Sequence, residues 1–143
     1  MTEQPHMTAA EYQEMLRRDK LGLLPAVKPT HPTGKRCEVD GIAFDSLTER
    51  DRYLWLKDQP EVEYVDVHPA FTLPGGVRFT ADFLVYTDGG TWAEDVKGRR
   101  PGTDFNRTWK TFNFHHALAP LIVVRRKGKG WKEHREPPRK RDW

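Results

Sequence analysis

Two short glycine-containing turns divide the middle of the chain into separate extended segments. The turns lie at residues 74–76 (Pro-Gly-Gly) and 88–90 (Asp-Gly-Gly). Residues 65–73, 77–86 and 91–97 around them are rich in β-branched and aromatic residues, and each is predicted to form a strand. Because short turns join antiparallel neighbours, the three segments predict an antiparallel meander.

The segments on either side of this meander predict two helices and a last strand. Residues 46–57 form a helix that opens with a Ser-x-x-Glu capping box and stops before Pro60. Residues 104–118 form a second helix, and the apolar run 121–124 is a buried strand. A short strand or hairpin with an Asp-Gly turn at 40–41 precedes the first helix. The predicted class is α/β (or α+β), with the order α-β-β-β-α-β.

The 143 residues suffice for a single domain. Residues 1–36 are expected to be a peripheral arm with a short helix near residues 8–18, residues 37–126 the core, and residues 127–143 a basic tail without fixed structure. Residues 125–143 contain nine Lys or Arg and three acidic residues, a net charge of +6. Because the whole chain has a net charge of +3, the remainder carries −3. A basic segment of this kind binds polyanions or simply keeps the protein solvated, and charge alone leaves both interpretations open.

Composition excludes several classes of protein. The single cysteine, Cys37, provides no internal disulfide and has no cysteine partner for a zinc site. The sequence contains neither an apolar leader nor a stretch of about 18 apolar residues, so we expect no membrane contact and a cytoplasmic location. It also lacks the glycine-rich phosphate loop of nucleotide-binding proteins, which predicts no nucleotide cofactor.

Strand alternation brings three charged residues together. If the predicted core face of the second strand consists of Phe79, Ala81, Phe83 and Val85, then Asp82 points away from that core. Asp95 and Lys97 are two residues apart on the next strand and share a face. The hairpin through residues 88–90 places Asp82 and Asp95 on neighbouring strands. We therefore expect two carboxylates and an ammonium group to converge.

Such a cluster has the parts needed to hydrolyse a phosphodiester. A divalent cation relieves the repulsion between the two carboxylates, and oxygen ligands suit Mg²⁺ or Mn²⁺. A bound cation polarises a phosphate, while a nearby lysine orients the attacking water or stabilises developing charge. Taken singly the residues are weak signals, and the capping box explains Glu49 without any catalysis.

Four segments resemble a known family. They are DGIAFDSLTERDRY (40–53), HPAFTL (68–73), TADF (80–83) and EDVKG (94–98). The family consists of small phage proteins, formerly a domain of unknown function, and is assigned to the PD-(D/E)xK nuclease superfamily near the endonuclease I-type Holliday-junction resolvases. The resemblance implies a restriction-endonuclease-like αβββαβ core with a mixed central sheet flanked by helices. It also implies Mg²⁺ dependence, DNA as substrate, and the host cytoplasm as location if the protein is phage-encoded.

The resemblance assigns roles residue by residue. Asp82 would be the central metal ligand, Asp95 the second acidic ligand, Lys97 the catalytic lysine, and Glu49 the helical acid that completes the metal site. Glu94 competes with Asp95 for the ligand role, and strand alternation favours Asp95. The family pattern has Gln before Pro69 where this chain has His68, which could act as a base or phosphate contact; we favour a structural role.

Further basic residues are candidates for contacts with DNA. They are Arg99, Arg100, Arg107, Lys110, Arg125, Arg126 and Lys127. Trp131 and Trp143, interleaved with basic residues, could stack on bases, although we favour a disordered tail that contacts phosphate. The function expected is a metal-dependent DNA endonuclease, selective for branched DNA and acting as a homodimer if it is a resolvase. The alternative is a non-catalytic DNA-binding accessory or packaging protein.

Overall fold

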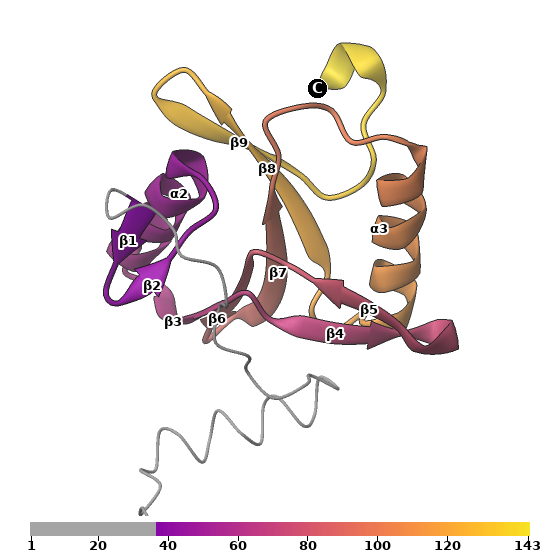
Figure 1. Ribbon diagram of the computed structural model, residues 1–143, viewed down its shortest axis with the longest axis horizontal. Helices are drawn as coiled ribbons and strands as arrows, with labels where there is room; N and C mark the ends of the chain where they lie inside the picture. Colours follow the sequence, from indigo (N-terminus) through magenta and orange to yellow (C-terminus); the bar gives the residue numbers. More distant parts are fainter. Residues whose placement is uncertain (1–36) are drawn as a thin grey trace, which may run out of the picture.

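A mixed five-stranded sheet with a helix packed on each face forms the centre of the molecule (Figure 1). The computed structural model describes residues 37–143, and the predicted N-terminal arm at 1–36 lies outside them. In chain order the elements are β1 (Glu38–Val39), β2 (Ile42–Ala43), α2 (Leu47–Asp58), β3 (Val62–Val67), β4 (Ala70–Leu73), η2 (Pro74–Gly76), β5 (Val77–Thr80), β6 (Phe83–Thr87), β7 (Gly90–Val96), α3 (Thr103–His115), β8 (Leu121–Lys127), β9 (Gly130–His134) and η3 (Lys140–Asp142). The mixed α/β class predicted from the sequence is confirmed.

Helix α2 begins where its capping sequence predicts. Ser46 has extended backbone angles, and its Oγ accepts a hydrogen bond 3.1 Å long from the backbone N–H of Glu49. The helix ends at Asp58, because Pro60 disfavours a helical conformation at the residue before it. Tyr53 and Leu56 are buried against the sheet, so the helix is anchored by one face.

The order of strands in the large sheet is β3-β6-β7-β8-β9. Strands β6 and β7 pair antiparallel across the turn that the sequence predicted. Strand β8 then runs parallel to β7, in a register that extends from Ala93–Leu121 to Val96–Val124. Parallel neighbours need a long crossover, and α3 supplies it. The helix packs on the sheet through Trp109, whose ring N–H donates to the backbone oxygen of Leu121 at 2.8 Å.

The first predicted strand, residues 65–73, is interrupted at His68 and Pro69. His68 adopts a φ of 55°, and proline has no N–H to donate to a ladder, so regular pairing stops there. Strand β3 stays in the five-stranded sheet beside β6. Strand β4 instead pairs with β5 in a separate two-stranded sheet, so the prediction of one continuous strand is wrong.

The second predicted strand, residues 77–86, is interrupted at Ala81 and Asp82, opposite the first break. β5 lies before this point and β6 after it. Across the interruption, side chains two residues apart face opposite sides of the sheet. Ala81 packs in the cluster that contains α3 residues, whereas Phe83 packs in the cluster that contains α2 residues.

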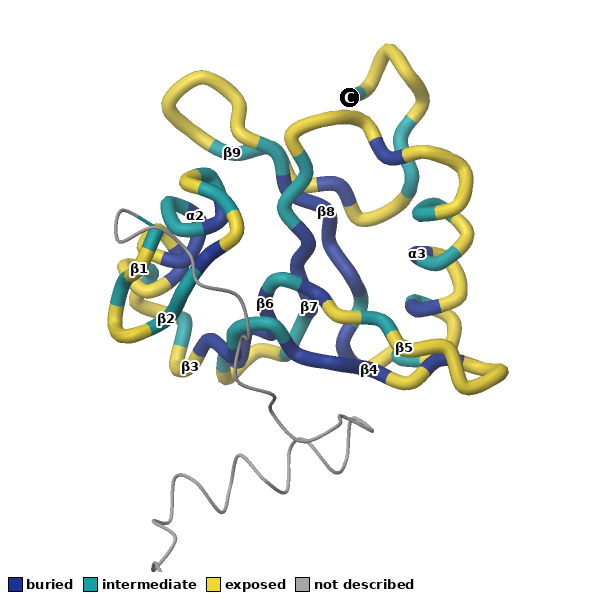
Figure 2. The backbone as a smooth tube through the Cα atoms, viewed as in Figure 1, coloured by how far each residue is buried: buried dark blue, intermediate teal, exposed yellow. Residues whose placement is uncertain are grey.

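The predicted core face of this segment is therefore corrected. The four residues that were expected to share one face are divided between the two clusters: Phe79 and Ala81 on the α3 side, Phe83 and Val85 on the α2 side. Leu84 and Tyr86 are buried as well, because helices cover both faces of β6. Figure 2 shows that burial is concentrated along the central strands and exposure along the connecting loops.

The basic C-terminal segment belongs to the fold, which corrects the prediction of a disordered tail. Strand β8 extends to Lys127, and β9 pairs with it antiparallel from Val123–His134 to Lys127–Gly130. His134 is buried and stacks on Trp143, with ring centroids 4.9 Å apart. The predicted boundary between residues 126 and 127 thus falls within strand β8.

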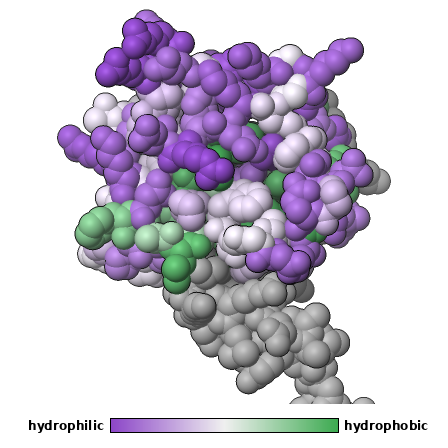
Figure 3. All heavy atoms as spheres, turned by 180° about the vertical axis from the view of Figure 1, so that it is seen from behind, coloured by the Kyte–Doolittle hydropathy of each residue, from purple (hydrophilic) through white to green (hydrophobic). Residues whose placement is uncertain are grey.

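The surface is mainly polar on the side opposite the view of Figure 1. Figure 3 shows that side as largely hydrophilic, with a hydrophobic area near its lower edge. Large apolar side chains that remain exposed include Phe114 and Leu118 at and after the end of α3. Within residues 37–143, no helix has the length and apolar character needed to cross a bilayer.

Candidate metal-binding active site

Asp82 lies at the break between β5 and β6, where its backbone still bonds to both neighbouring segments. Its carbonyl oxygen accepts from the N–H of His68 at 2.9 Å, and its N–H donates to the carbonyl of Glu94 at 3.0 Å. Its side-chain Oδ2 accepts from the backbone N–H of Val96 at 2.6 Å. These three bonds hold the Asp82 carboxyl beside the end of β7.

Asp95 and Lys97 lie at that end of β7, as strand alternation predicts. The Asp95 side chain is nearly inaccessible to solvent, and its Oδ2 lies 2.8 Å from Lys97 Nζ. Lys97 Nζ also lies 4.3 Å from the centre of the Phe105 ring on α3. An acid on one side and an aromatic face on the other thus position the ammonium group.

The carboxyl groups of Asp82 and Asp95 are both buried and lie close enough for each to shift the pKa of the other. Burial, followed by the charges of Asp95 and Glu49, raises the pKa of Asp82 to about 9. Burial also raises the pKa of Asp95, although the Lys97 ammonium opposes that shift. A further positive charge, in addition to the Lys97 ammonium, would favour ionisation of both acids.

Glu49 contributes the third carboxylate from the first turn of α2. Its charge raises the pKa of both aspartates, which places the three acids in one electrostatic cluster. Glu49 is only 9% exposed, and its Oε2 has no hydrogen-bond partner among the described residues. The backbone of Glu49 completes the helix cap. The cap therefore does not account for where the Oε2 atom points.

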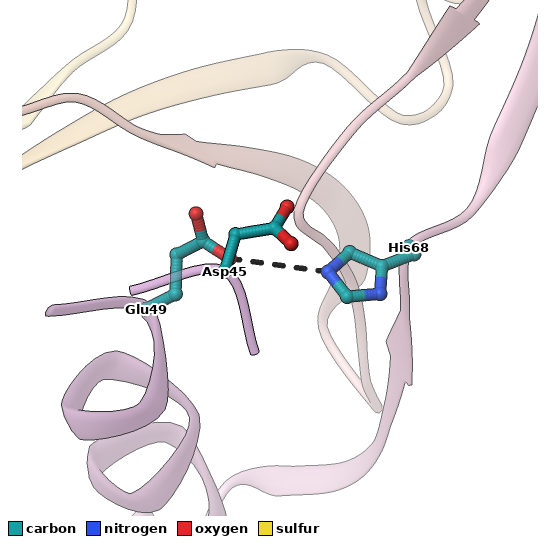
Figure 4. A group of neighbouring side chains, drawn as sticks. All are labelled: Asp45, Glu49 and His68. Carbon is teal, nitrogen blue, oxygen red and sulfur yellow. Dashed lines mark ion pairs between the residues drawn. The ribbon is translucent and has the colours of Figure 1, made fainter. Parts of the chain in front are cut away.

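The structure thus brings Glu49, Asp82, Asp95 and Lys97 together, and it adds two residues that sequence reasoning did not assign to the site. Ligand atoms of Asp45, Glu49 and His68 all lie within 4.8 Å of one another. His68 Nε2 is 3.9 Å from Glu49 Oε2, and Figure 4 shows the two side chains facing each other with Asp45 beside them. Asp45 could have been found from its spacing of four residues before Glu49, and His68 from its place in the segment that resembles the family.

Glu94, the competitor of Asp95, points to the other face of β7. Both of its carboxylate oxygens accept hydrogen bonds from the guanidinium of Arg52, at 2.8 and 2.7 Å. Trp92 also donates to Glu94, at 2.9 Å. Because its carboxylate is occupied on the α2 side of the sheet, Glu94 is not available to the Asp82–Asp95 cluster.

The predicted DNA-contact residues occupy several surfaces. Arg99 and Arg100 are exposed on the loop after Lys97, and Arg107 and Lys110 are exposed on α3. The remaining three residues lie on β8. Arg125 lies over the Trp143 ring, and Arg126 forms an ion pair with Asp51 at 3.2 Å. Lys127 is exposed at the end of the strand.

The two tryptophans considered as candidates for base stacking already have partners in the chain. Arg52 and Arg126 both lie over the Trp131 ring, with guanidinium carbons 5.3 and 5.0 Å from its centre. Trp143 stacks on His134. Base stacking on either ring would therefore require these contacts to be displaced.

The donor chemistry of this cluster suits a divalent cation, although the described residues whose ligand atoms lie within 4.8 Å of one another are Asp45, Glu49 and His68. Asp82, Asp95 and Glu49 offer carboxylate oxygens, the ligands that Mg²⁺ and Mn²⁺ prefer. Burial, followed for Asp82 by the charges of Asp95 and Glu49, raises the pKa of both aspartates, and a bound cation would favour their ionised forms. Comparison of the chain with protein families, with curated proteins and with solved structures finds no match.

Proposed function

We propose that this chain is a divalent-metal-dependent DNA endonuclease of the PD-(D/E)xK class. The observation that carries the proposal is the buried, electrostatically coupled pair Asp82–Asp95, together with Lys97, whose Nζ lies 2.8 Å from Asp95 Oδ2. A carboxyl pair with a raised pKa costs folding stability, and such groups cluster at functional sites. Binding of a cation would offset the cost of this arrangement.

The order of elements supports the same assignment. With β3, β6 and β7 counted as the three core strands, the chain runs α2-β3-β6-β7-α3-β8. This is the αβββαβ order that the resemblance implies for a restriction-endonuclease-like core. The acidic cluster lies where α2, the break before β6 and the end of β7 meet, and these are the elements that carry the quoted motifs.

Each residue has a distinct part in the proposed reaction. Asp82, Asp95 and Glu49 would hold the cation, which when bound would offset the charge of the scissile phosphate and polarise its phosphorus. Lys97, kept in place by Asp95 and Phe105, would hold the attacking water or the charge that develops on the phosphate. The N–H of Val96 fixes the orientation of the Asp82 carboxylate.

A polyanionic substrate is supported by exposed basic residues on the loop after Lys97 and on α3. Arg99 and Arg100 follow Lys97 directly and are exposed. Arg107 and Lys110 are exposed on α3, the helix whose Phe105 touches Lys97. Cations around an acidic metal centre allow a phosphate backbone to approach it, since phosphate contacts provide most of the affinity of proteins for DNA.

The test is cleavage of a labelled linear duplex in the presence of Mg²⁺, of Mn²⁺ or of EDTA. The native protein and Asp88→Asn, an exposed acid in the β6–β7 turn, should cut with metal and not with EDTA. Asp82→Asn should bind the duplex and leave it intact. Binding without cutting by the native protein under every metal would contradict the proposal, and would favour the alternative of a DNA-binding accessory protein.

Selectivity for branched DNA is a narrower proposal that rests on the resemblance alone. Paired, symmetric cuts in a four-way junction require two active sites and hence a homodimer. The same assay with a junction of matched sequence tests it: preferential, paired cleavage of the junction is expected of a resolvase. Equal cleavage of both substrates would leave a general endonuclease.

A further inference from the structure

Asp45, Glu49 and His68 form a group of potential ligands beside the Asp82–Asp95 pair. Their ligand atoms lie within 4.8 Å of one another, and they come from the start of α2 and from the break after β3 (Figure 4). The group combines two carboxylates with an imidazole, a donor set different from that of the aspartate pair. Different donors select different ions.

Two buried polar atoms in this group have no hydrogen-bond partner among the described residues. They are Glu49 Oε2 and His68 Nε2, and the residue that carries the first is nine-tenths buried. The two atoms face each other across 3.9 Å, too far for a hydrogen bond. Buried polar atoms normally have hydrogen-bond partners. An ion or a water molecule between Glu49 Oε2 and His68 Nε2 would provide them.

The spacing is compatible with a shared ion. Two ligands that each bind at about 2.1 Å are separated by about 3 to 3.4 Å around a tetrahedral or octahedral ion. A small rotation of either side chain would close 3.9 Å to that range. His68 has a φ of 55°, and the carbonyl of Asp82 accepts from its N–H, so its backbone is fixed relative to the neighbouring cluster.

We infer that Asp45, Glu49 and His68 hold a second divalent cation, and that His68 makes this position prefer transition-metal ions such as Mn²⁺ over Mg²⁺. Imidazole is a poor ligand for Mg²⁺ and a good one for transition metals, while carboxylates accept both. Glu49 lies within both groups and would be shared between two neighbouring ions, an arrangement used by enzymes that cleave phosphate esters. The inference shares one residue, Glu49, with the proposed nuclease site and rests on the proposed function to that extent. Asp45 and His68 would bind the second cation only.

The test measures metal binding without DNA. Equilibrium dialysis gives the number of Mn²⁺ ions bound, and pulsed electron paramagnetic resonance detects the ¹⁴N of an imidazole that ligates Mn²⁺. The native protein and His115→Gln, a control on exposed α3, should bind two ions and show the nitrogen signal. His68→Gln should bind one ion and lose that signal. Asp45→Asn should weaken the same ion at least tenfold.

The variant Asp82→Asn separates this inference from the proposed function. It should lose the first ion and keep both the second ion and the nitrogen signal. Absence of that signal from the native protein, or its persistence in His68→Gln, would overturn the second site and leave the nuclease proposal untouched. Conversely, a protein that binds two ions in this pattern and cuts no DNA would keep the second site and lose the nuclease.

Discussion

Arg52 on α2 donates two hydrogen bonds to Glu94 on β7, and neither side chain is accessible to solvent. The same guanidinium bonds Glu133 on β9 at 2.7 Å and lies 4.3 Å from the centre of the Trp55 ring. One side chain therefore ties the first described helix to the centre and to the edge of the sheet. Because of these bonds Glu94 has a structural role, although it is next in sequence to the proposed ligand Asp95.

Glu94→Gln should destabilise the fold while leaving the proposed active site in place. Removing one partner leaves the Arg52 guanidinium buried with less compensation, at a cost of about 3–5 kcal/mol. Urea unfolding followed by circular dichroism measures this. The control Asp51→Asn breaks the more exposed pair with Arg126 and should cost less than about 1 kcal/mol. Equal effects of the two substitutions would contradict the structural role of Glu94.

Asp82→Asn should stabilise the metal-free protein at neutral and alkaline pH. The pKa of Asp82 is raised to about 9, so the native state retains a proton that the unfolded chain releases near pH 4. The free energy of unfolding of the native protein should then fall as pH rises between about 4 and 9. The asparagine variant should show a flatter profile and a gain of roughly 1–2 kcal/mol near pH 8. Melting temperatures measured in EDTA across this range test the sign, and Asp88→Asn is the control.

Local features of the sequence were sufficient to predict α2 and the approach of Asp82 to Asp95. The Ser46 cap and the Asp-Gly-Gly turn act over a few residues, and alternation along β7 separates Asp95 from Glu94. The interruption at Pro69 had a visible local signal, the proline itself. The interruption at Asp82 on the neighbouring segment had no local sequence signal. It follows from the pairing of β4 with β5 outside the five-stranded sheet.

Strand β9 was missed because its stabilising contacts are distant in sequence. Its residues are mostly charged or polar, a composition typical of a solvated tail. It is held by pairing with β8 and by the contact of Glu133 with Arg52, 81 residues away. His68 was assigned a structural role for a similar reason: only the fold brings it opposite Glu49 on α2.

Lys97→Met should reduce catalysis far more than DNA binding. The methionine keeps an apolar stem beside Phe105 but removes the charge next to Asp95. A positioned proton-transfer or charge-stabilising group contributes about 10²–10⁴-fold, so kcat should fall by that range. Single-turnover cleavage gives the rate, and fluorescence anisotropy with Ca²⁺ gives the Kd. The control Lys129→Met, in the exposed β8–β9 turn, should match the native protein in both. A proportionate loss of affinity would instead make Lys97 a substrate-binding residue.

The paired strands of the β8–β9 hairpin, unlike its exposed turn, should resist trypsin as well as the core does. Arg125 and Lys132 pair with each other in this hairpin, and His134 is buried at the end of β9. Cleavage after either basic residue should therefore wait for the hairpin to open. Limited digestion followed by mass spectrometry measures the order of cuts, and digestion in denaturing urea shows that both bonds are intrinsically cleavable. Arg52→Met, which removes the bond to Glu133, should speed cleavage after Lys132 at least severalfold, whereas Arg50→Met should not. Immediate cleavage of the native protein after Arg125 or Lys132 would show an open hairpin and contradict the fifth strand.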